Sequence, residues 1–487
     1  MRRKMMVPIF VAALCLSGCA AETDSNENKS VTVITTTEDT SMEATSEDSE
    51  MYSCDEGDAH AIDVDGKEET YQSISVEKTG DSEGDEADFY GSNAAVFAQN
   101  GAALTISNAQ IKTNGKHANA VFSYGEGTVV NISDSQIDTE QSNSGGIMVT
   151  GGGTLNATNL TVTTQSGSSA PIRSDRGGGQ ISVNGGTYKS YGSGSPAIYS
   201  TADINVENAT LYSDVAEAVV VEGKNSVTIA NADVTGKNTT HNSDKADVYR
   251  NVMIYQSMSG DSEEGKGVFT MTGGSLTSEN GGMFFVTNTI ADINLENVTM
   301  NYATDDFLRI EKAGWGNDGS NGGQVTLNAK NQNLDGIITV DEISVLNMYL
   351  KENASFNGCI ESSGKVYVEL DADSTWTLTG DSEVTALTCD SDAINLNGYK
   401  LKVNGKVYEE GTACSGEAIE IIAPASSGMG QMPPGDGNGQ PPENPEGMEP
   451  PEGGKQPPEK PEGMKEGEQP PEKPDGNEIG APPEKPE

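Results

Sequence analysis

The sequence feature that most constrains the fold is a six-residue motif that recurs eight times between residues 106 and 300. An apolar residue occupies each end of the motif, and its third residue is Asn, Asp or Gly. Because these three residue types tolerate a positive φ, the motif predicts two short strands joined by a tight corner. The eight copies are ISNAQI (106–111), ISDSQI (132–137), ATNLTV (157–162), VNGGTY (183–188), VENATL (206–211), IANADV (229–234), MTGGSL (271–276) and LENVTM (295–300).

A second series of apolar residues lies outside these motifs, each within a short segment of alternating side chains. Together the two series give three short strands in each period of about 25 residues, which describes one coil of a parallel β-helix. The sequence therefore predicts an all-β fold, a single-stranded right-handed parallel β-helix of about 11–13 coils. The residues of this second series are Val96, Val121, Ile147, Ile172, Ile198, Val220, Ile254, Phe284, Leu308, Ile338 and Ile360.

The composition agrees with a thin, repetitive core. Only 34% of the residues are hydrophobic and 5% are aromatic, too few to fill one wide globular core along the whole chain. The formal net charge is −46. A charge of this sign and size repels phosphates, so it excludes a protein that binds nucleic acid through a general basic surface.

The N-terminus has the features of an export signal. Three basic residues precede a short apolar stretch at 7–16, which is too short to span a bilayer as a helix. The following Leu16-Ser17-Gly18-Cys19 resembles the bacterial lipobox, in which the cysteine is acylated and the signal is cut before it. We therefore expect residues 1–18 to be a lipoprotein signal peptide and Cys19 to anchor the protein to the cell membrane, outside the cytoplasm. An ordinary secretory signal is the alternative.

Composition divides the rest of the chain into three parts. Residues 19–60 are acidic and rich in Ser and Thr, which predicts a flexible tether. Residues 61–422 contain the repeats and form the predicted β-helix domain with its caps. Residues 423–487 hold 17 of the 20 prolines in near-repeats such as PPEKPEGM (457–464), which predicts a disordered tail. This tail is either a solvated spacer or a ligand for a proline-binding partner.

Four cysteines remain after the expected cleavage and lipidation: Cys54, Cys359, Cys389 and Cys414. Cys359 and Cys389 fall at similar positions of successive repeats. This spacing predicts either a stacked disulfide between them or a ladder of reduced, buried thiols.

Outward-pointing residues of successive coils should align into columns. On the first strand of each coil these columns mix aromatic, guanidinium and carboxylate side chains, which can stack on sugar rings and bind hydroxyl groups. Ordinary cross-strand pairing that stabilises the sheet is the alternative. The candidate glycan-binding residues are Arg173, Asp175, Arg176, Tyr199, Glu222, Tyr255, Arg309, Glu311 and Trp315.

Two long loops, 258–267 and 314–323, should lie on the same edge as DRGGG (175–179). In the second loop Asn317, Asp318 and Asn321 supply oxygen ligands of the kind that Ca²⁺ prefers. The sequence requires no cofactor, and Ca²⁺ is the metal that these residues would suit. Trp315 of the same loop is either a platform for a sugar ring or a lid over the core.

The evidence for catalysis is weaker than the evidence for a binding face. Asp305-Asp306 and Arg309-Ile310-Glu311-Lys312 resemble the Asp-Asp and Arg-x-Lys elements of polygalacturonases. Here the two elements are nearly adjacent, and no Gly-His-Gly accompanies them. Neighbouring Asp residues on a strand also point to opposite faces, which is poor geometry for a cooperating acid and base. We assign no catalytic residue and favour a protein that is not an enzyme.

Several phrases resemble a family of exported, clostridial-type parallel β-helix proteins with the pectin-lyase-like fold. The resemblance implies a fold that lyases, glycosidases, adhesins and carbohydrate-binding proteins share. The signal and the tail are similar to those of a clostridial β-helix family that binds plant polysaccharides with Ca²⁺. The phrases are IRSDRGGG (172–179), GSPAIYSTADI (194–204), VVVEGKNSV (219–227), YQSMSGD (255–261), FFVTNT (284–289) and GWGNDGSNGGQ (314–324).

The function we expect is that of a cell-surface lipoprotein whose β-helix presents a non-catalytic binding face to polysaccharide or to another cell surface. One alternative is a polysaccharide lyase or glycoside hydrolase that acts on the same face. Another is an adhesin with a protein partner, or a structural spacer.

Overall fold

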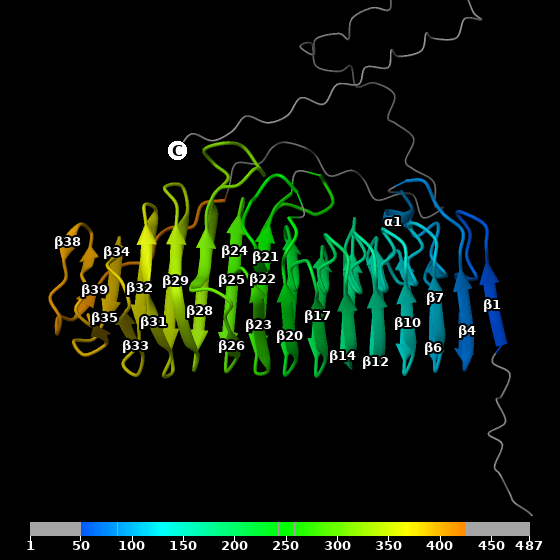
Figure 1. Ribbon diagram of the computed structural model, residues 1–487, viewed down its shortest axis with the longest axis horizontal. Coiled ribbons are helices and arrows are strands. Elements are labelled where there is room, and N and C mark those ends of the chain that lie inside the picture. Colours follow the sequence, from blue (N-terminus) through cyan, green and yellow to red (C-terminus); the bar gives the residue numbers. More distant parts are fainter. Residues whose placement is uncertain (1–49, 85, 242, 258, 424–487) are drawn as a thin grey trace, which may run out of the picture. The chain divides into compact units, whose positions relative to one another are not determined.

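The computed structural model describes residues 50–423 except 85, 242 and 258. The expected signal peptide, Cys19, most of the tether and the proline-rich tail lie outside these residues. The described part is almost entirely β-structure, with 39 strands and one short helix, α1 (Glu86–Tyr90). Its strands form an elongated stack, with loops of very different lengths along one edge (Figure 1).

Sheet B has 14 strands, one from each successive turn of the chain, and every neighbouring pair is parallel. Its strands are β2 (Ile62–Asp65), β5 (Val96–Gln99), β8 (Val121–Tyr124), β11 (Ile147–Thr150), β13 (Ile172–Ser174), β15 (Ile198–Ser200), β18 (Val219–Glu222), β21 (Arg250–Tyr255), β24 (Gly282–Thr287), β27 (Asp306–Ile310), β29 (Asn333–Val340), β31 (Ser355–Ser362), β33 (Thr375–Leu378) and β36 (Ile394–Asn395).

Sheet A has 22 strands and contains every six-residue motif, six of them divided between two strands and two, at 157–162 and 183–188, within the single long strands β12 and β14. Its strands are β1 (Glu50–Cys54), β3 (Glu68–Gln72), β4 (Ile74–Lys78), β6 (Ala103–Ser107), β7 (Gln110–Thr113), β9 (Val129–Ser133), β10 (Gln136–Thr139), β12 (Gly153–Thr164), β14 (Gly179–Ser190), β16 (Asp203–Glu207), β17 (Thr210–Ser213), β19 (Ser226–Ala230), β20 (Asp233–Lys237), β22 (Lys266–Thr272), β23 (Ser275–Asn280), β25 (Thr289–Glu296), β26 (Thr299–Asn301), β28 (Gly323–Lys330), β30 (Val345–Lys351), β32 (Lys365–Leu370), β35 (Ala386–Cys389) and β39 (Cys414–Ser415).

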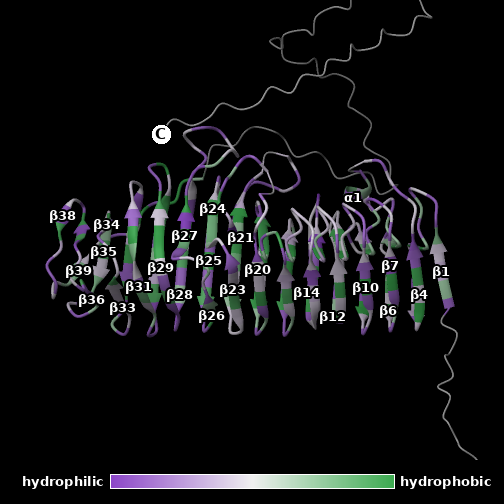
Figure 2. Cartoon of the chain, viewed as in Figure 1, coloured by the Kyte–Doolittle hydropathy of each residue, from purple (hydrophilic) through white to green (hydrophobic). Residues whose placement is uncertain are grey.

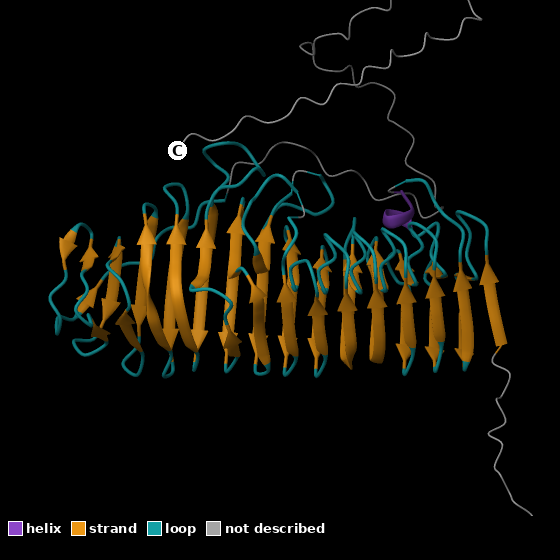
Figure 3. Ribbon diagram, in the orientation of Figure 1, coloured by secondary structure: helices purple, strands orange, loops and turns teal. Residues whose placement is uncertain are grey.

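The two sheets enclose a narrow core of stacked aliphatic side chains. Each inward residue lies above its equivalent in the next turn, and members of one such column are fully buried. The strands alternate apolar and polar residues, whereas the loops along the edge are mostly hydrophilic (Figures 2 and 3). This architecture of long parallel sheets is compatible with the predicted parallel β-helix. The column consists of Ile111, Ile137, Val162, Tyr188, Leu211 and Val234.

The predicted corners are confirmed at all eight motifs. The third residue of every motif has a positive φ, between 49° and 75°. Some of these side chains also hydrogen bond along the stack, as Asn159 does to Asp134 at 3.4 Å. The corner residues are Asn108, Asp134, Asn159, Gly185, Asn208, Asn231, Gly273 and Asn297.

The second apolar series was assigned wrongly at two positions. Val219, not Val220, stands beside Ile198, and Val252 stands beside Val219. Val220 therefore points outward, and Ile254 lies one inward position further along its strand. Val219 follows Ile198 after 21 residues and Val252 follows Val219 after 33, so the length of the repeat changes here and sequence spacing alone misplaced the row.

The two ends of the stack differ from the expected caps. Strand β1 lies within the predicted tether and pairs in parallel with β4, so ordered structure begins before residue 61. At the C-terminal end the pairing becomes antiparallel, between β35 and β39 and between β37 (Leu401–Val403) and β38 (Lys406–Val407) of the three-stranded sheet C. The third strand of sheet C is β34 (Ser382–Val384).

The predicted stacking of Cys359 on Cys389 is wrong. Cys359 lies in β31 of sheet B, whereas Cys389 lies in β35 of sheet A, so the two are not equivalent positions of successive turns. Both are buried, and all four cysteines of the described residues are thiols. None of the described helices is long and apolar enough to cross a membrane.

Candidate functional site

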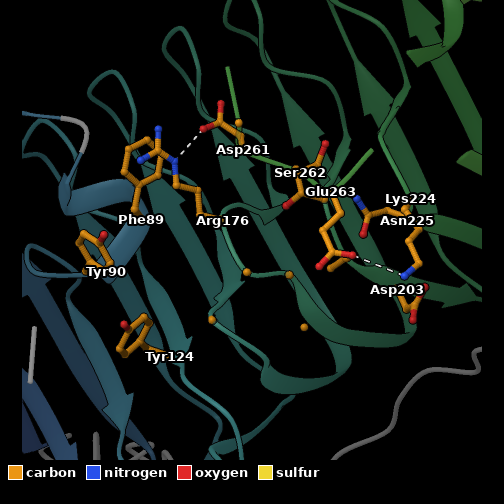
Figure 4. A pocket seen from close by; sticks show the side chains of 17 residues that line it. Phe89, Tyr90, Tyr124, Arg176, Asp203, Lys224, Asn225, Asp261, Ser262 and Glu263 are labelled. Atoms are coloured by element: carbon orange, nitrogen blue, oxygen red, sulfur yellow. Dashed lines mark hydrogen bonds and ion pairs between the residues drawn. The ribbon is translucent and has the colours of Figure 1, made fainter. Parts of the chain in front are cut away.

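Two segments cover part of the outer face of sheet B. One contains α1, which precedes β5 in the chain yet reaches the later strands β11 and β13. The Thr150 hydroxyl donates to the Phe89 carbonyl at 2.7 Å, and the Asp88 carboxylate is 3.3 Å from the Arg173 guanidinium. The second segment is the loop 259–265. The two segments flank a pocket of about 530 Å³ (Figure 4).

The pocket has an aromatic side and a charged side. Phe89, Tyr90 and Tyr124 line the first, with the rings of Tyr90 and Tyr124 6.1 Å apart and edge to face. Charged and amide groups line the second: Arg176, Asp203, Lys224, Asn225, Asp261 and Glu263. The backbone of 177–179 forms its floor, and all three glycines have a positive φ, of 78°, 59° and 146°. Aromatic faces opposite polar groups are typical of sites that bind small polar ligands.

Arg176 connects the two segments. Its Nε donates to Asp261 Oδ1 at 2.8 Å, and its guanidinium carbon is 3.7 Å from the centre of the Phe89 ring. The expectation that DRGGG and the loop after β21 lie on the same edge is therefore confirmed. Because Arg176 is held by a carboxylate and a ring, it fixes the wall of the pocket.

A second cavity of about 280 Å³ lies next to the first, with Phe89 and Asp261 lining both. The side chain of Arg173 is 11% exposed here, and its Nη2 is 3.2 Å from Asp175 and 3.3 Å from Asp88. Burial raises the pKa of Asp175 to about 7; Arg173 lowers it, and Asp261 and Asp88 raise it. Asp175 thus titrates near neutral pH.

Asp88 also organises the residues beneath α1. Its Oδ2 is 3.2 Å from His117 Nδ1, and its Oδ1 accepts from Asn119 at 3.3 Å. No sequence pattern singles out Asp88, Phe89 or Tyr90, which lie in a segment expected only to cap the stack. Their positions depend on a contact between strands far apart in the chain.

Glu222 is held by two tyrosines. Tyr199 and Tyr255 both donate to its Oε2, at 2.5 Å and 2.8 Å. Burial raises the pKa of the Glu222 carboxyl, whereas hydrogen bonds from Ser257, Tyr199 and Tyr255 lower it. Tyr199 and Tyr255 each follow a residue of the second apolar series, Ile198 and Ile254, so the sequence predicts them in one row. Instead, Tyr255 lies in the row of Glu222. This cluster borders the second cavity through Tyr199 and Tyr255.

Trp315 is a lid and not an exposed platform. It is 7% exposed and packs on Val220, Met253, Tyr255 and Phe285. Its ring is 5.2 Å from that of Tyr255, edge to face. The apolar residues beneath it continue the outward column between Tyr199 and Arg309, so they interrupt the expected binding face.

Arg309 and Glu311 form a separate cluster. Arg309 pairs with Asp306 at 3.0 Å and with Glu311 at 3.6 Å. Burial raises the pKa of the Glu311 carboxyl, whereas Arg309 lowers it. Five strand-to-strand steps separate Arg309 from Arg173, a distance of about 24 Å.

The proposed calcium ligands lie in the loop that carries Trp315. The Asn321 amide donates to the carbonyls of Ala313 at 2.7 Å and Trp315 at 2.9 Å, so it stabilises the loop. Among the described residues no group of three or more His, Cys, Asp or Glu side chains could hold a metal ion. Ca²⁺ binding by Asn317, Asp318 and Asn321 stays a prediction.

No protein-family model, curated protein or solved structure matches this chain.

Proposed function

We propose that the protein is a surface lipoprotein that binds a polysaccharide segment without cleaving it, in the pocket between α1 and the loop 259–265. The observation that carries the proposal is the pairing of Tyr90 and Tyr124 with a charged wall around a volume of about 530 Å³. That volume lies within the range of small-molecule sites, about 300–1,000 Å³. Sugar rings present both apolar faces and hydroxyl edges, so they match both sides.

The charges of the pocket favour a neutral glycan. Three carboxylates, Asp203, Asp261 and Glu263, line it against the two cations Arg176 and Lys224. Arg176 forms an ion pair with Asp261 at 2.8 Å, and Lys224 is 3.4 Å from Glu263. No cation among the lining residues is therefore left over for a uronate, and the net charge of −46 adds a general repulsion of polyanions.

The location and fold belong to the same proposal. Acylation at Cys19 would hold the chain outside the cytoplasm, where polysaccharides are accessible. The coils would be right-handed and of the pectin-lyase-like type, as the phrase at 172–179 and its companions imply. Neither part of the proposal requires a metal, and a contribution from Ca²⁺ would come from Asn317, Asp318 and Asn321.

The proposal is tested by applying the full chain to immobilised neutral and uronate oligosaccharides, with Ca²⁺ and with chelator. We expect retention on neutral glycans and loss of at least tenfold in affinity for Tyr90→Ala. Tyr191→Ala is the matched control, because Tyr191 is an exposed tyrosine whose ring is tilted against that of Tyr212, and neither residue lines the pocket. Preference for uronates would overturn only the argument that the pocket favours a neutral glycan, and not the proposal that the protein binds polysaccharide. Absence of retention on every glycan would overturn the function and favour an adhesin with a protein partner.

One observation supports an enzyme as the second candidate. Asp175 has a pKa of about 7 beside Arg173 in the smaller cavity, and a carboxyl that titrates near neutrality suits general acid–base catalysis. A polysaccharide lyase or glycoside hydrolase would release new reducing ends from a bound glycan. Asp175→Asn would abolish that release and leave retention on the glycan intact.

A further inference from the structure

The C-terminal end of the stack brings two cysteines together. Strand β39 runs antiparallel to β35, and Cys414 lies directly opposite Cys389 in that ladder. Directly opposed residues of antiparallel strands have Cα atoms about 4.5–5.5 Å apart. This spacing falls within the Cα–Cα range of disulfides, about 4.4–6.8 Å. Opposed side chains of such a pair also project from the same face of the sheet.

The pairing of β35 with β39 makes each cysteine part of the other's surroundings. Burial, with a smaller contribution from Cys414, raises the pKa of the Cys389 thiol to about 11. Cys389 is 4% exposed, whereas Cys414 is partly exposed. An oxidant in solution would therefore reach Cys414 first. Neither Cys54 nor Cys359 lies in the same ladder, since β1 and β31 pair with other strands.

We propose that Cys389 and Cys414 are a redox pair that forms a disulfide by exchange with a small-molecule or protein disulfide. The Cys414 thiol loses its proton, and its thiolate attacks the oxidant and displaces one thiolate. The Cys389 thiol then loses its proton and attacks the Cys414 sulfur, which releases the second thiolate. The two protein thiols lose two electrons and two protons, and the oxidant disulfide becomes two thiols.

The bond would fasten the last described segment of the chain to the sheet. At present β39 is held through two residue pairs and through Gly416, whose amide donates to Leu387 at 2.9 Å. Beyond it, Ile419 exchanges two hydrogen bonds with the Asn347 side chain, at 2.8 Å and 2.9 Å. The segment runs from the edge strand β35 back to Asn347 of β30, and the disulfide would fix β39 along the otherwise open edge of β35. This inference is independent of glycan binding.

The experiment compares the purified full chain before and after equilibration with oxidised and reduced glutathione. Peptide mass mapping should identify one cross-link, between the peptides that contain Cys389 and Cys414. Thiol alkylation should show the loss of two thiols, and the oxidised form should melt at a temperature about 5 °C higher. Cys389→Ser and Cys414→Ser should each abolish the cross-link and the shift, whereas Cys359→Ser should retain both.

Two outcomes would overturn the proposal. One is a cross-link that involves Cys54 or Cys359 in the folded wild-type chain. The other is full alkylation of Cys389 and Cys414 after equilibration with oxidised glutathione alone. Because Ser is close to Cys in size and Cys414 is partly exposed, the Cys414→Ser chain should stay folded, and its circular dichroism spectrum checks this.

Discussion

Arg176 and Asp261 are 85 residues apart in the chain, and their side chains meet at 2.8 Å on the outer face of sheet B. The ring of Phe89, from a third segment, lies 3.7 Å from the same guanidinium. Three segments from different turns of the stack thus meet at one side chain. The wall of the candidate pocket depends on this meeting point.

We expect Arg176→Ala to loosen the loop 259–265 without unfolding the stack. The backbone amides of this loop should exchange with solvent hydrogen at least five times faster, because Asp261 loses its partner. Asp261→Asn should give a similar increase, and the double variant little more than either one, since both remove the same contact. Hydrogen exchange with mass spectrometry measures this. Arg309→Ala is the control, because Arg309 pairs within its own segment. An effect of Arg309→Ala on the loop 259–265 would contradict the prediction.

The stability of the protein should depend on the titration of Asp175. Its pKa is raised from 3.8 to about 7 in the folded state by burial, although Arg173 lowers it. Between about pH 4 and pH 7 the folded state holds more protons than the unfolded state, so stability should fall as the pH rises through this window. Asp175→Asn should flatten the dependence. Denaturant titrations at several pH values test this, with the exposed Asp55→Asn as control. An unchanged slope in Asp175→Asn would contradict the assignment.

Trp315→Ala should destabilise the protein and leave glycan binding in the pocket unaffected. Trp315 covers Val220, Met253 and Phe285, so its truncation opens a cavity and costs about 3 kcal/mol. Trp315→Phe should recover part of the loss. Denaturant unfolding and glycan retention, measured on the same samples, separate the two roles. A loss of retention with unchanged stability would identify Trp315 as a sugar platform.

Tyr188→Phe should stabilise the protein. Tyr188 is fully buried, and its hydroxyl has no hydrogen-bond partner among the residues that the structure describes. An unpaired buried polar group costs about 1–3 kcal/mol, so its removal should raise the free energy of unfolding by about 1 kcal/mol. Tyr367→Phe is the matched control, because the Tyr367 hydroxyl donates to Glu369 at 2.7 Å and that bond would be lost. Stabilisation by both substitutions, or by neither, would contradict the argument.

The corner residues should tolerate Gly better than Ala. Asn108 has a φ of 52°, a conformation that costs a side chain with a Cβ about 1–2 kcal/mol and that Asn partly relieves. Asn108→Ala should therefore lower the free energy of unfolding by about 1 kcal/mol, whereas Asn108→Gly should change it little. The comparison is made by denaturant unfolding. Equal losses for Ala and Gly would mean that the Asn side chain, and not the backbone conformation, stabilises the corner.

The repeat could be predicted because its signals are local. A positive φ at Asn108 or Asn231 depends on the residue itself, and an inward Ile or Val follows from alternation along a strand. The prediction failed where local signals end. Val220 and Ile254 were misplaced after connections of unusual length, and Cys359 was paired with Cys389 from spacing that does not distinguish sheet A from sheet B.

The sequence predicted correctly which kinds of side chain lie together on this face, but it did not predict what each side chain does there. Arg173, Tyr199 and Glu222 do lie together on one face, but they are bound to Asp88, Asp175 and Tyr255 and stabilise the site from below. The residues that line the pocket from above include Phe89 and Tyr90 of α1. Nothing in the sequence of α1 indicates which turn of the stack it covers.

The sequence by itself determined the parallel stack of turns, the position of its corners and the alternation that builds its core. These features follow from backbone preferences and burial within one period, so the same sequence pattern for them recurs in each repeat. Only the tertiary structure decided the site. A loop that packs across several turns loses chain entropy, and specific long-range contacts must offset that loss. Contacts of this kind, such as that of Asp88 with Arg173, have no periodic pattern in the sequence.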